Sequence, residues 1–183
     1  MEYSDKALNI LETARKLFSQ KGFKAVTTRE IAKEANVNEV TVFRIFQSKE
    51  ILFEHVISQM IFKPKISEYI DDNEKDLNKY LNGVGNLIHT IILENIDLFK
   101  IELSENKRMQ NLNLINRFPN EIKDKMIKYL INVQKQPEKE AILFSISFMT
   151  AVHGLCMNLY LIKTFTPAPD FKECLDFIIK KFY

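Results

Sequence analysis

Apolar residues recur every three or four positions along most of the chain, which is the spacing of one face of an α-helix. The first such run comprises Ala7, Leu11, Ala14, Leu17 and Phe18. Ser4 is placed to cap its start, and Gly22 can end it because glycine readily adopts the left-handed conformation that follows a helix. Phe23 can then fold back onto the last turn. The pattern predicts one amphipathic helix before residue 22.

Two short helices are predicted next. Thr27 and Glu30 form a capping box, in which the threonine oxygen accepts from the Glu30 amide and the carboxylate reaches back to the Thr27 amide. Asparagines stand at both ends of the interruption at residues 36–38; the first tolerates a left-handed backbone and the second is a good N-cap. The pattern therefore predicts a helix on each side of a three-residue turn, spanning residues 28–46.

Helical spacing continues to the end of the chain. We predict further helices over residues 49–62, 77–93, 97–105, 119–134, 138–162 and 171–181, with a loop or irregular helix at 107–117. No segment shows a convincing alternation of apolar and polar residues, which is the pattern of a strand. The predicted fold class is all-α, with about nine helices.

Composition agrees with a globular helical protein. The chain has 183 residues, of which 46% are hydrophobic and 27% charged, so disordered and fibrous classes are excluded. Only four Gly and five Pro are present, too few for the many turns of a sandwich or barrel. Two isolated cysteines make no disulfide framework, and the N-terminal residues carry no apolar signal segment, so we expect a cytoplasmic protein.

One segment has the length of a membrane span. Residues 141–162 contain no formally charged side chain, which is close to what a bilayer core requires. The segment also contains polar residues, among them Ser145, Thr150 and His153. A helix of this kind in an amphipathic chain more often lies buried between two protein surfaces, so we expect no membrane partner, with membrane association kept as the alternative.

The two short helices at 28–46 fit two arrangements. In a helix-turn-helix the second helix lies in the major groove of DNA and its N-terminal residues reach the base edges. The same spacing also occurs in a plain helical hairpin of a bundle. Spacing alone does not separate the two, and the residue types must decide.

The residue pattern favours the first arrangement. It includes Thr27-Thr28-x-x-Ile31-Ala32-x-x-Ala35-x-Val37, Val42-Phe43-x-x-Phe46, Lys49-x-x-Leu52-Phe53 and the preceding Phe18-x-x-Lys21-Gly22-Phe23. From residue 7 to residue 55 this pattern resembles the DNA-binding domain of TetR/AcrR-family repressors. The resemblance implies a helix-turn-helix DNA-binding domain at residues 1–48, a connecting helix at 49–65 and a ligand-binding and dimerisation domain at 66–183. It also implies a homodimer that binds double-stranded palindromic operator DNA and is released by a small, largely apolar inducer.

The resemblance also implies which residues meet DNA. These are Thr27, Thr28, Arg29, Asn38, Glu39, Val40, Thr41, Phe43, Arg44 and Lys49. The two threonines and Lys49 match family positions that contact phosphates, to which hydroxyls and helix N-termini are suited. Arg44 suits a guanine edge or a phosphate, Thr41 a thymine methyl or a phosphate, and Asn38 an adenine or a phosphate.

The second short helix departs from the family pattern in several places. Phe43 stands where the family usually has Tyr and lacks the hydroxyl that would bind a phosphate. Glu39 and Val40 replace a pair that is often basic or small followed by Gly. Glu39 would repel phosphate but could accept a hydrogen bond from cytosine N4. We therefore expect a more apolar recognition helix, for which thymine methyl groups are suitable partners.

Candidates for the dimer face and the pocket lie beyond residue 61. The dimer candidates are small or apolar residues of the uncharged helix and the final helix, namely Ser147, Ala151, Gly154, Asn158, Leu175, Ile178 and Ile179. The pocket candidates are aromatic, histidine or methionine side chains, namely Phe62, His89, Phe99, Met126, Tyr129, Phe144, Phe148 and Met149. Ordinary core packing is the competing interpretation for each of them, because pockets are mostly apolar. For His89, a buried and hydrogen-bonded histidine is the competing interpretation.

The sequence offers no enzyme signature. The three histidines have no metal-ligand spacing, and neither a nucleophile-elbow nor a phosphate-loop motif occurs. We expect no catalytic residue, no metal and no cofactor. The remaining alternative is a helical interaction protein, or a membrane-associated one, that does not bind DNA. Residues 1–65 hold eleven Lys and Arg against eight Asp and Glu, so the positive excess lies in the segment expected to meet phosphate.

Overall fold

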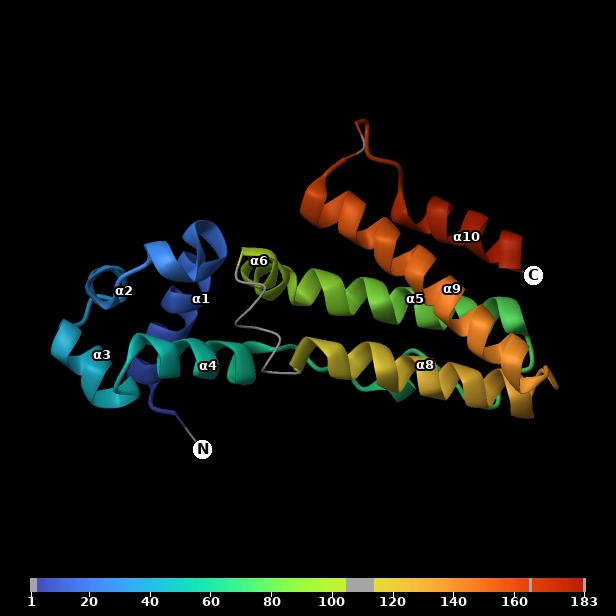
Figure 1. Cartoon of the computed structure of the whole chain (residues 1–183), viewed down its shortest axis with the longest axis horizontal. Coiled ribbons are helices and arrows are strands. Elements are labelled where there is room, and N and C mark those ends of the chain that lie inside the picture. Colours follow the sequence, from blue (N-terminus) through green and yellow to red (C-terminus); the bar gives the residue numbers. More distant parts are fainter. Residues whose placement is uncertain (1–2, 105–113, 165, 183) are drawn as a thin grey trace. The chain divides into compact units, whose positions relative to one another are not determined.

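The computed structural model describes residues 3–104, 114–164 and 166–182, and within these ranges it contains nine α-helices and no strand. The all-α prediction is therefore confirmed for this part of the chain. The chain divides into two compact units, unit 1 with Met1–Ile61 and Asn95–Leu114, and unit 2 with Phe62–Glu94 and Ile115–Tyr183 (Figure 1). Of the described residues, 95–104 group with the N-terminal helices, whereas the predicted division places them in the C-terminal domain.

Within the described residues, unit 1 contains five helices. They are α1 (Asp5–Ala25), α2 (Thr28–Glu34), α3 (Glu39–Phe46), α4 (Lys49–Met60) and α6 (Ile96–Ser104). Helix α1 packs against both α4 and α6. Phe18, Phe23 and Phe53 are buried at its centre, with ring centroids 4.9–5.5 Å apart. These rings join α1 to α4. Helix α2 packs against α1 and α3, and α3 also packs against α4.

The end of α1 follows the sequence pattern. Gly22 has φ 77° and ψ 159°, a backbone conformation that side-chain-bearing residues rarely adopt. The chain therefore leaves the regular helix there, and Phe23 folds back so that its ring lies 5.5 Å from that of Phe18. The predicted helix end and the predicted fold-back are both confirmed.

Unit 2 is built from four α-helices and two short helical segments. They are the 3-10 turn Ile66–Glu68, α5 (Leu77–Glu94), α8 (Leu114–Asn132), α9 (Glu138–Cys156), a π-helix at Met157–Ile162 and α10 (Phe171–Phe182). Helices α5, α9 and α10 pack against one another (Figure 1). Tyr80 of α5 stacks on Tyr129 of α8 with ring centroids 3.4 Å apart, and both rings are buried.

Two glycines of α5 allow close packing. At Gly83 an added Cβ would lie 2.2 Å from the carbonyl oxygen of Tyr69, and at Gly85 it would lie 2.5 Å from Cδ1 of Leu175. The missing side chains therefore let the loop before α5 approach one part of the helix and α10 approach another.

One predicted helix boundary is wrong. Helix α8 begins at Leu114, not at Pro119, so the proline stands inside it. A proline removes one backbone hydrogen bond, but its φ is compatible with a helix. Of the segment predicted as a loop or irregular helix at 107–117, residues 107–113 lie outside the described residues and the rest belong to α8. The uncharged helix also changes geometry, because its last six residues form the π-helix, where the Asn158 amide donates to the Gly154 carbonyl.

The segment Glu138–Ile162 is long and apolar enough to cross a membrane by length and composition, which is weak evidence for a span. In unit 2 it packs one side against α5 and α10, where Ser145, Phe148 and Val152 are completely buried. Only 28% of its most apolar stretch is buried in the single chain. The other side of the segment is therefore an open apolar surface.

Candidate nucleic-acid interface

The starts of α2 and α3 are each capped by the side chain of the residue that precedes the helix. The Thr27 hydroxyl oxygen accepts from the Glu30 amide at 3.1 Å, and Asn38 Oδ1 accepts from the Val40 amide at 3.0 Å. Asn36 has φ 54°, the left-handed conformation predicted for the turn. The two helices and the turn between them are therefore formed where the sequence placed them.

The Glu30 carboxylate, which forms the second half of the predicted capping box, also bonds to a residue of α1. The Glu30 carboxylate receives a hydrogen bond from Lys21 Nζ at 2.5 Å. This bond, helped by the Thr27 amide, holds the pKa of Glu30 below its usual value. Glu30 thus fastens α2 to the end of α1 in addition to capping its own helix.

A hydrogen bond joins the starts of α2 and α3. The Thr28 hydroxyl donates to Glu39 Oε1 at 2.7 Å, and both side chains are half-buried. Because it receives this bond, the Glu39 carboxylate is directed toward α2. The Thr28 hydroxyl is engaged inside the protein, so a phosphate at this position would meet the backbone amides of α2 before it met the hydroxyl.

Lys49 is also engaged inside unit 1. Its Nζ donates to the carbonyl oxygens of Phe23 and Val26 at 2.9 and 2.8 Å, and it lies 4.2 Å from the centroid of the Phe23 ring. An ammonium group has three donors, so one remains for another acceptor. The structure gives this lysine a role that the sequence did not indicate, which is to fix the turn between α1 and α2.

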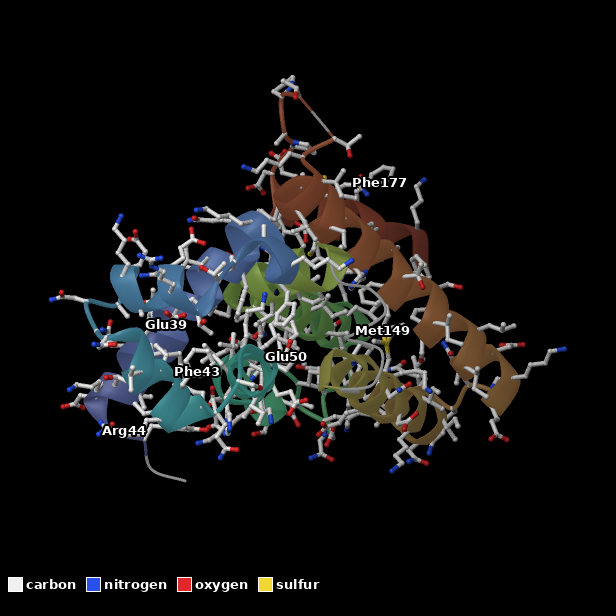
Figure 2. The ribbon with its side chains drawn as sticks, turned by 60° about the vertical axis from the view of Figure 1, so that its left-hand side comes forward. Glu39, Phe43, Arg44, Glu50, Met149 and Phe177 are labelled. Carbon is white, nitrogen blue, oxygen red and sulfur yellow. The ribbon has the colours of Figure 1, made fainter. Side chains whose placement is uncertain are left out.

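The outward face of α3 carries apolar side chains and one cation. Val40 is 71% exposed and Phe43 45% exposed, whereas Val42 and Phe46 are buried, as predicted. Phe43 and Arg44 both project from the helix in Figure 2, and Arg44 forms no hydrogen bond or ion pair with any residue that the structure describes. Of the other predicted contacts, Thr27, Arg29 and Asn38 are exposed and Thr41 is half-buried.

The predicted pocket residues are divided between the two units. Phe99 belongs to α6 of unit 1, whereas the other seven belong to unit 2. In unit 2, Met126, Tyr129 and Phe148 are buried core residues and Phe62 is 39% exposed. Phe144, which is half-buried, packs its ring against Phe182, and so does Phe148. Met149 is half-buried on α9 (Figure 2).

His89 lies in a small aromatic cluster of unit 2. Its Nε2 is 2.9 Å from the hydroxyl of Tyr160 in the π-helix, and its ring is stacked on Phe171 of α10 at 4.0 Å. Burial lowers the pKa of His89 below the usual histidine value. The hydrogen-bonded histidine expected as the competing interpretation is what the structure shows.

An open groove of about 510 Å³ lies on unit 2 beside α8. It is lined by Asp72, Glu121, Asp124, Lys125, Lys128, Tyr129, Asn132 and Val133. Of the predicted pocket residues, only Tyr129 takes part. Its lining is mostly charged and polar, which does not suit a largely apolar inducer.

The open side of α9 was only partly recognised from the sequence. Ser147 is exposed, and Gly154 has nothing within 4 Å of an added Cβ. Leu175 and Ile179 were predicted in the dimer face but are 1% exposed inside unit 2. The sequence interpretation missed the exposed apolar residues Leu143, Ile146, Ile162 and Phe177. Helical spacing places the first two opposite the buried stripe of α9, but the spacing alone does not say which of the two sides is left open.

Within the described residues no group of three His, Cys, Asp or Glu side chains could hold a metal ion. Cys156 and Cys174 are free thiols, and burial raises the pKa of Cys156 to about 12. A thiol with this pKa is a poor nucleophile at neutral pH.

A capped helix-turn-helix with an outward second helix defines a DNA-binding regulator. Residues 10–56 match the family described as bacterial regulatory proteins, tetR family. A helix-turn-helix-type transcriptional regulator of Bacillus subtilis, YvkB, is 31% identical over 155 residues, which cover 80% of this chain and 81% of the relative. The chain belongs to the tetR family of transcriptional regulators and is not an enzyme.

Solved structures agree with this assignment at the level of the fold. NalD of Pseudomonas aeruginosa, the secondary repressor of the MexAB-OprM multidrug efflux pump, has a TM-score of 0.67 at 19% identity, covering 96% of this chain and 95% of its own. A TetR-like transcriptional regulator from Rhodococcus sp. RHA1 has a TM-score of 0.67 at 13% identity, covering 100% and 96%.

Proposed function

We propose that the protein is a cytoplasmic repressor that binds a palindromic operator as a homodimer and leaves it when a small, largely apolar inducer binds. The observation that carries this proposal is the outward face of α3. Val40, Phe43 and Arg44 stand there exposed on a helix that is capped and joined to α2 before any DNA is present. A rigid helix of this kind can enter the major groove without first having to fold.

The groups around α3 suit the DNA backbone. The N-terminus of α2 offers unpaired backbone amides beside the exposed Thr27 and Arg29, and Lys49 retains one donor. Amides at a helix start and basic side chains are common phosphate ligands in protein–DNA complexes. These contacts would set the orientation of α3 in the groove, while residues of α3 itself would read the bases.

The dimer proposal rests on the open side of α9 and α10. Leu143 and Ile146 on α9 are 57% and 48% exposed, and Phe177 on α10 is 64% exposed (Figure 2). A second copy of the same surface related by a two-fold axis would cover these side chains on both chains at once. Two chains related in this way present two recognition helices to two half-sites, which explains why the operator should be palindromic.

The inducer proposal has more limited support. It is typical of the family, and unit 2 supplies aromatic and methionine side chains, such as Met149 and the ring cluster at His89, that could contact an apolar ligand. An inducer would act by binding more tightly to a conformation that does not fit the operator.

The central experiment is selection of bound DNA from a random pool by the full-length protein. We expect a palindrome to be enriched and its affinity to fall steeply with salt, because phosphate contacts release counterions. Arg44→Ala should weaken binding to the selected site by about 1–3 kcal/mol if the guanidinium contacts a base. Lys24→Ala removes an exposed lysine of α1 and serves as the control. Failure to enrich any palindrome would contradict the operator proposal, and unchanged affinity of the Arg44 variant would remove that residue from the site.

The inducer is tested on the selected operator. A collection of small molecules is screened for release of the protein from this DNA, and an apolar compound that releases it supports the proposal. A membrane role for Glu138–Ile162 predicts instead that the protein needs detergent or vesicles to stay dispersed. A stable dimer in detergent-free buffer would contradict that alternative.

A further inference from the structure

We propose that Val40 and Phe43 read the methyl groups of thymines, so that each half-site of the operator carries thymine where α3 is closest to the bases. This inference rests on the proposed function and adds the chemical identity of the bases. Its evidence is which side chains on α3 are available and which are already engaged.

The polar side chains at the start of α3 are engaged within the protein. Asn38 Oδ1 caps the helix through the Val40 amide, and Glu39 Oε1 accepts from the Thr28 hydroxyl. The side chain of Asn38 retains its amide donors, but the carboxylate of Glu39 is directed toward α2. The outward surface next to them is therefore made by the isopropyl group of Val40 and the ring of Phe43.

Val40 and Phe43 are both exposed to water, and this exposure does not stabilise the fold. Val40 is 71% and Phe43 45% exposed, and they stand three positions apart on the same side of the helix. The neighbouring Val42 and Phe46 complete the core of unit 1 without them. Apolar surface of this kind on a helix placed to enter a groove is suited to an apolar partner in that groove.

The major groove offers one such partner on unmodified DNA. Each base pair presents hydrogen-bonding groups, and only thymine adds a methyl group. Side chains three apart on a helix are about 5–6 Å apart at Cβ, which corresponds to between one and two base steps of about 3.4 Å. Val40 and Phe43 would therefore contact two thymines that are adjacent or separated by one base. Arg44, which follows Phe43, would contact a guanine or a phosphate beside them.

The test replaces single thymines of the selected operator by deoxyuridine, which removes the methyl group and leaves base pairing unchanged. Binding of the full-length protein is measured by titration. We expect deoxyuridine at one contacted position of one half-site to weaken binding about fourfold, as for one methyl group that is no longer buried. The same substitution at the equivalent position of both half-sites should weaken binding about 16-fold. Deoxyuridine at thymines outside the half-sites should have no effect.

Protein variants connect the methyl groups to the two side chains. Val40→Ala should bind the unmodified operator more weakly and should lose its response to deoxyuridine at one position, whereas Phe43→Ala should lose it at the other. Leu8→Ala, which shortens an apolar residue of α1 that is 47% exposed, should respond to deoxyuridine as the unchanged protein does.

The outcomes separate this inference from the proposed function. If a palindrome is enriched but contains no thymine in its half-sites, or deoxyuridine leaves affinity unchanged, the methyl reading is wrong and the operator function stands. If no sequence is enriched at all, the proposed operator function itself has failed.

Discussion

Lys49 shows how one side chain can serve two parts of a small domain. Its ammonium group closes the turn between α1 and α2 through two carbonyl oxygens and lies over the ring of Phe23. A half-buried cation in this position lowers the free energy of the folded state and still carries charge near the expected DNA surface. The two roles have different experimental signatures.

We predict that Lys49→Met lowers the free energy of unfolding by about 1–3 kcal/mol, because two carbonyl oxygens lose their donor. The measurement is urea unfolding followed by circular dichroism. Lys24→Ala, at an exposed position of α1, should change the free energy of unfolding by less than about 0.5 kcal/mol. If the third donor also contacts a phosphate, the salt dependence of operator binding should fall by about one unit of slope in Lys49→Met. Unaltered stability would show that the carbonyl contacts are weak in solution.

At the scale of elements, the packing of α5 depends on two glycines, which have no Cβ. Gly83 faces the carbonyl of Tyr69, and Gly85 lies under Leu175 of α10. Alanine is a better helix former than glycine, so a helix at the surface would gain from either substitution. Here the neighbouring atoms leave no room for a Cβ.

We predict that Gly83→Ala destabilises the protein by about 1–3 kcal/mol, because the loop must move away from a carbonyl that an added Cβ would overlap. Thermal unfolding provides the measurement. Lys79→Ala, on the exposed side of the same helix, is the matched control and should be close to neutral. A stabilised Gly83→Ala protein would mean that the loop before α5 does not pack as described.

Burial favours the neutral form of His89 where α5 meets the π-helix and α10. Burial lowers its pKa in the folded state, so the unfolded chain binds a proton at a higher pH than the folded chain does. Stability should therefore be lost as the pH falls through about 6.5, the ordinary histidine value, and should continue to fall toward the lower folded-state pKa.

We predict that His89→Gln reduces the loss of unfolding free energy between about pH 8 and pH 5, because glutamine has no proton to gain in that range. Desolvation lowers the pKa of His153 as well, and His153→Gln separates its contribution. Chemical unfolding at several pH values provides the data. An identical pH dependence with and without His89 would show that protonation leaves the contact undisturbed.

Elements with local signals were predicted correctly, and those set by distant contacts were not. Ser4, Thr27 and Asn38 each cap the helix that follows them, as predicted, because a cap involves only the next three residues. The start of α8 escaped prediction because Pro119 is a typical first-turn residue and the helix continues past it. The carbonyl contacts of Lys49 escaped prediction because its partners lie more than 20 residues earlier in the chain.

At the scale of the whole molecule, the proposed dimer would cover the apolar side of Glu138–Ile162 that the single chain leaves open. One side of α9 is buried in unit 2, and the other exposes Leu143 and Ile146. Sequence periodicity could not distinguish the side that packs within the chain from the side left open, because both are apolar. That is why Leu175 and Ile179, which lie inside unit 2, were assigned to the dimer face.

We predict that Ile146→Asp dissociates the dimer, raising its dissociation constant at least about 100-fold, because a two-fold interface would bury two unpaired carboxylates. Operator affinity should fall in parallel. The oligomeric state is measured by analytical ultracentrifugation. Lys79→Asp places the same carboxylate on the exposed side of α5, with a change in charge of two instead of one, and should leave the dimer intact. A dimer that tolerates aspartate at residue 146 would place the contact between copies elsewhere.

The hydrogen bond between Thr28 and Glu39 has a kinetic consequence. It joins the starts of α2 and α3 before any DNA arrives, so no ordering step should delay the encounter with the operator. Related complexes formed by preorganised surfaces usually differ more in how fast they dissociate than in how fast they form. Changes at Val40 or Arg44 should therefore shorten the lifetime of the operator complex and leave its rate of formation nearly constant. Selectivity among DNA sites would then be expressed as residence time.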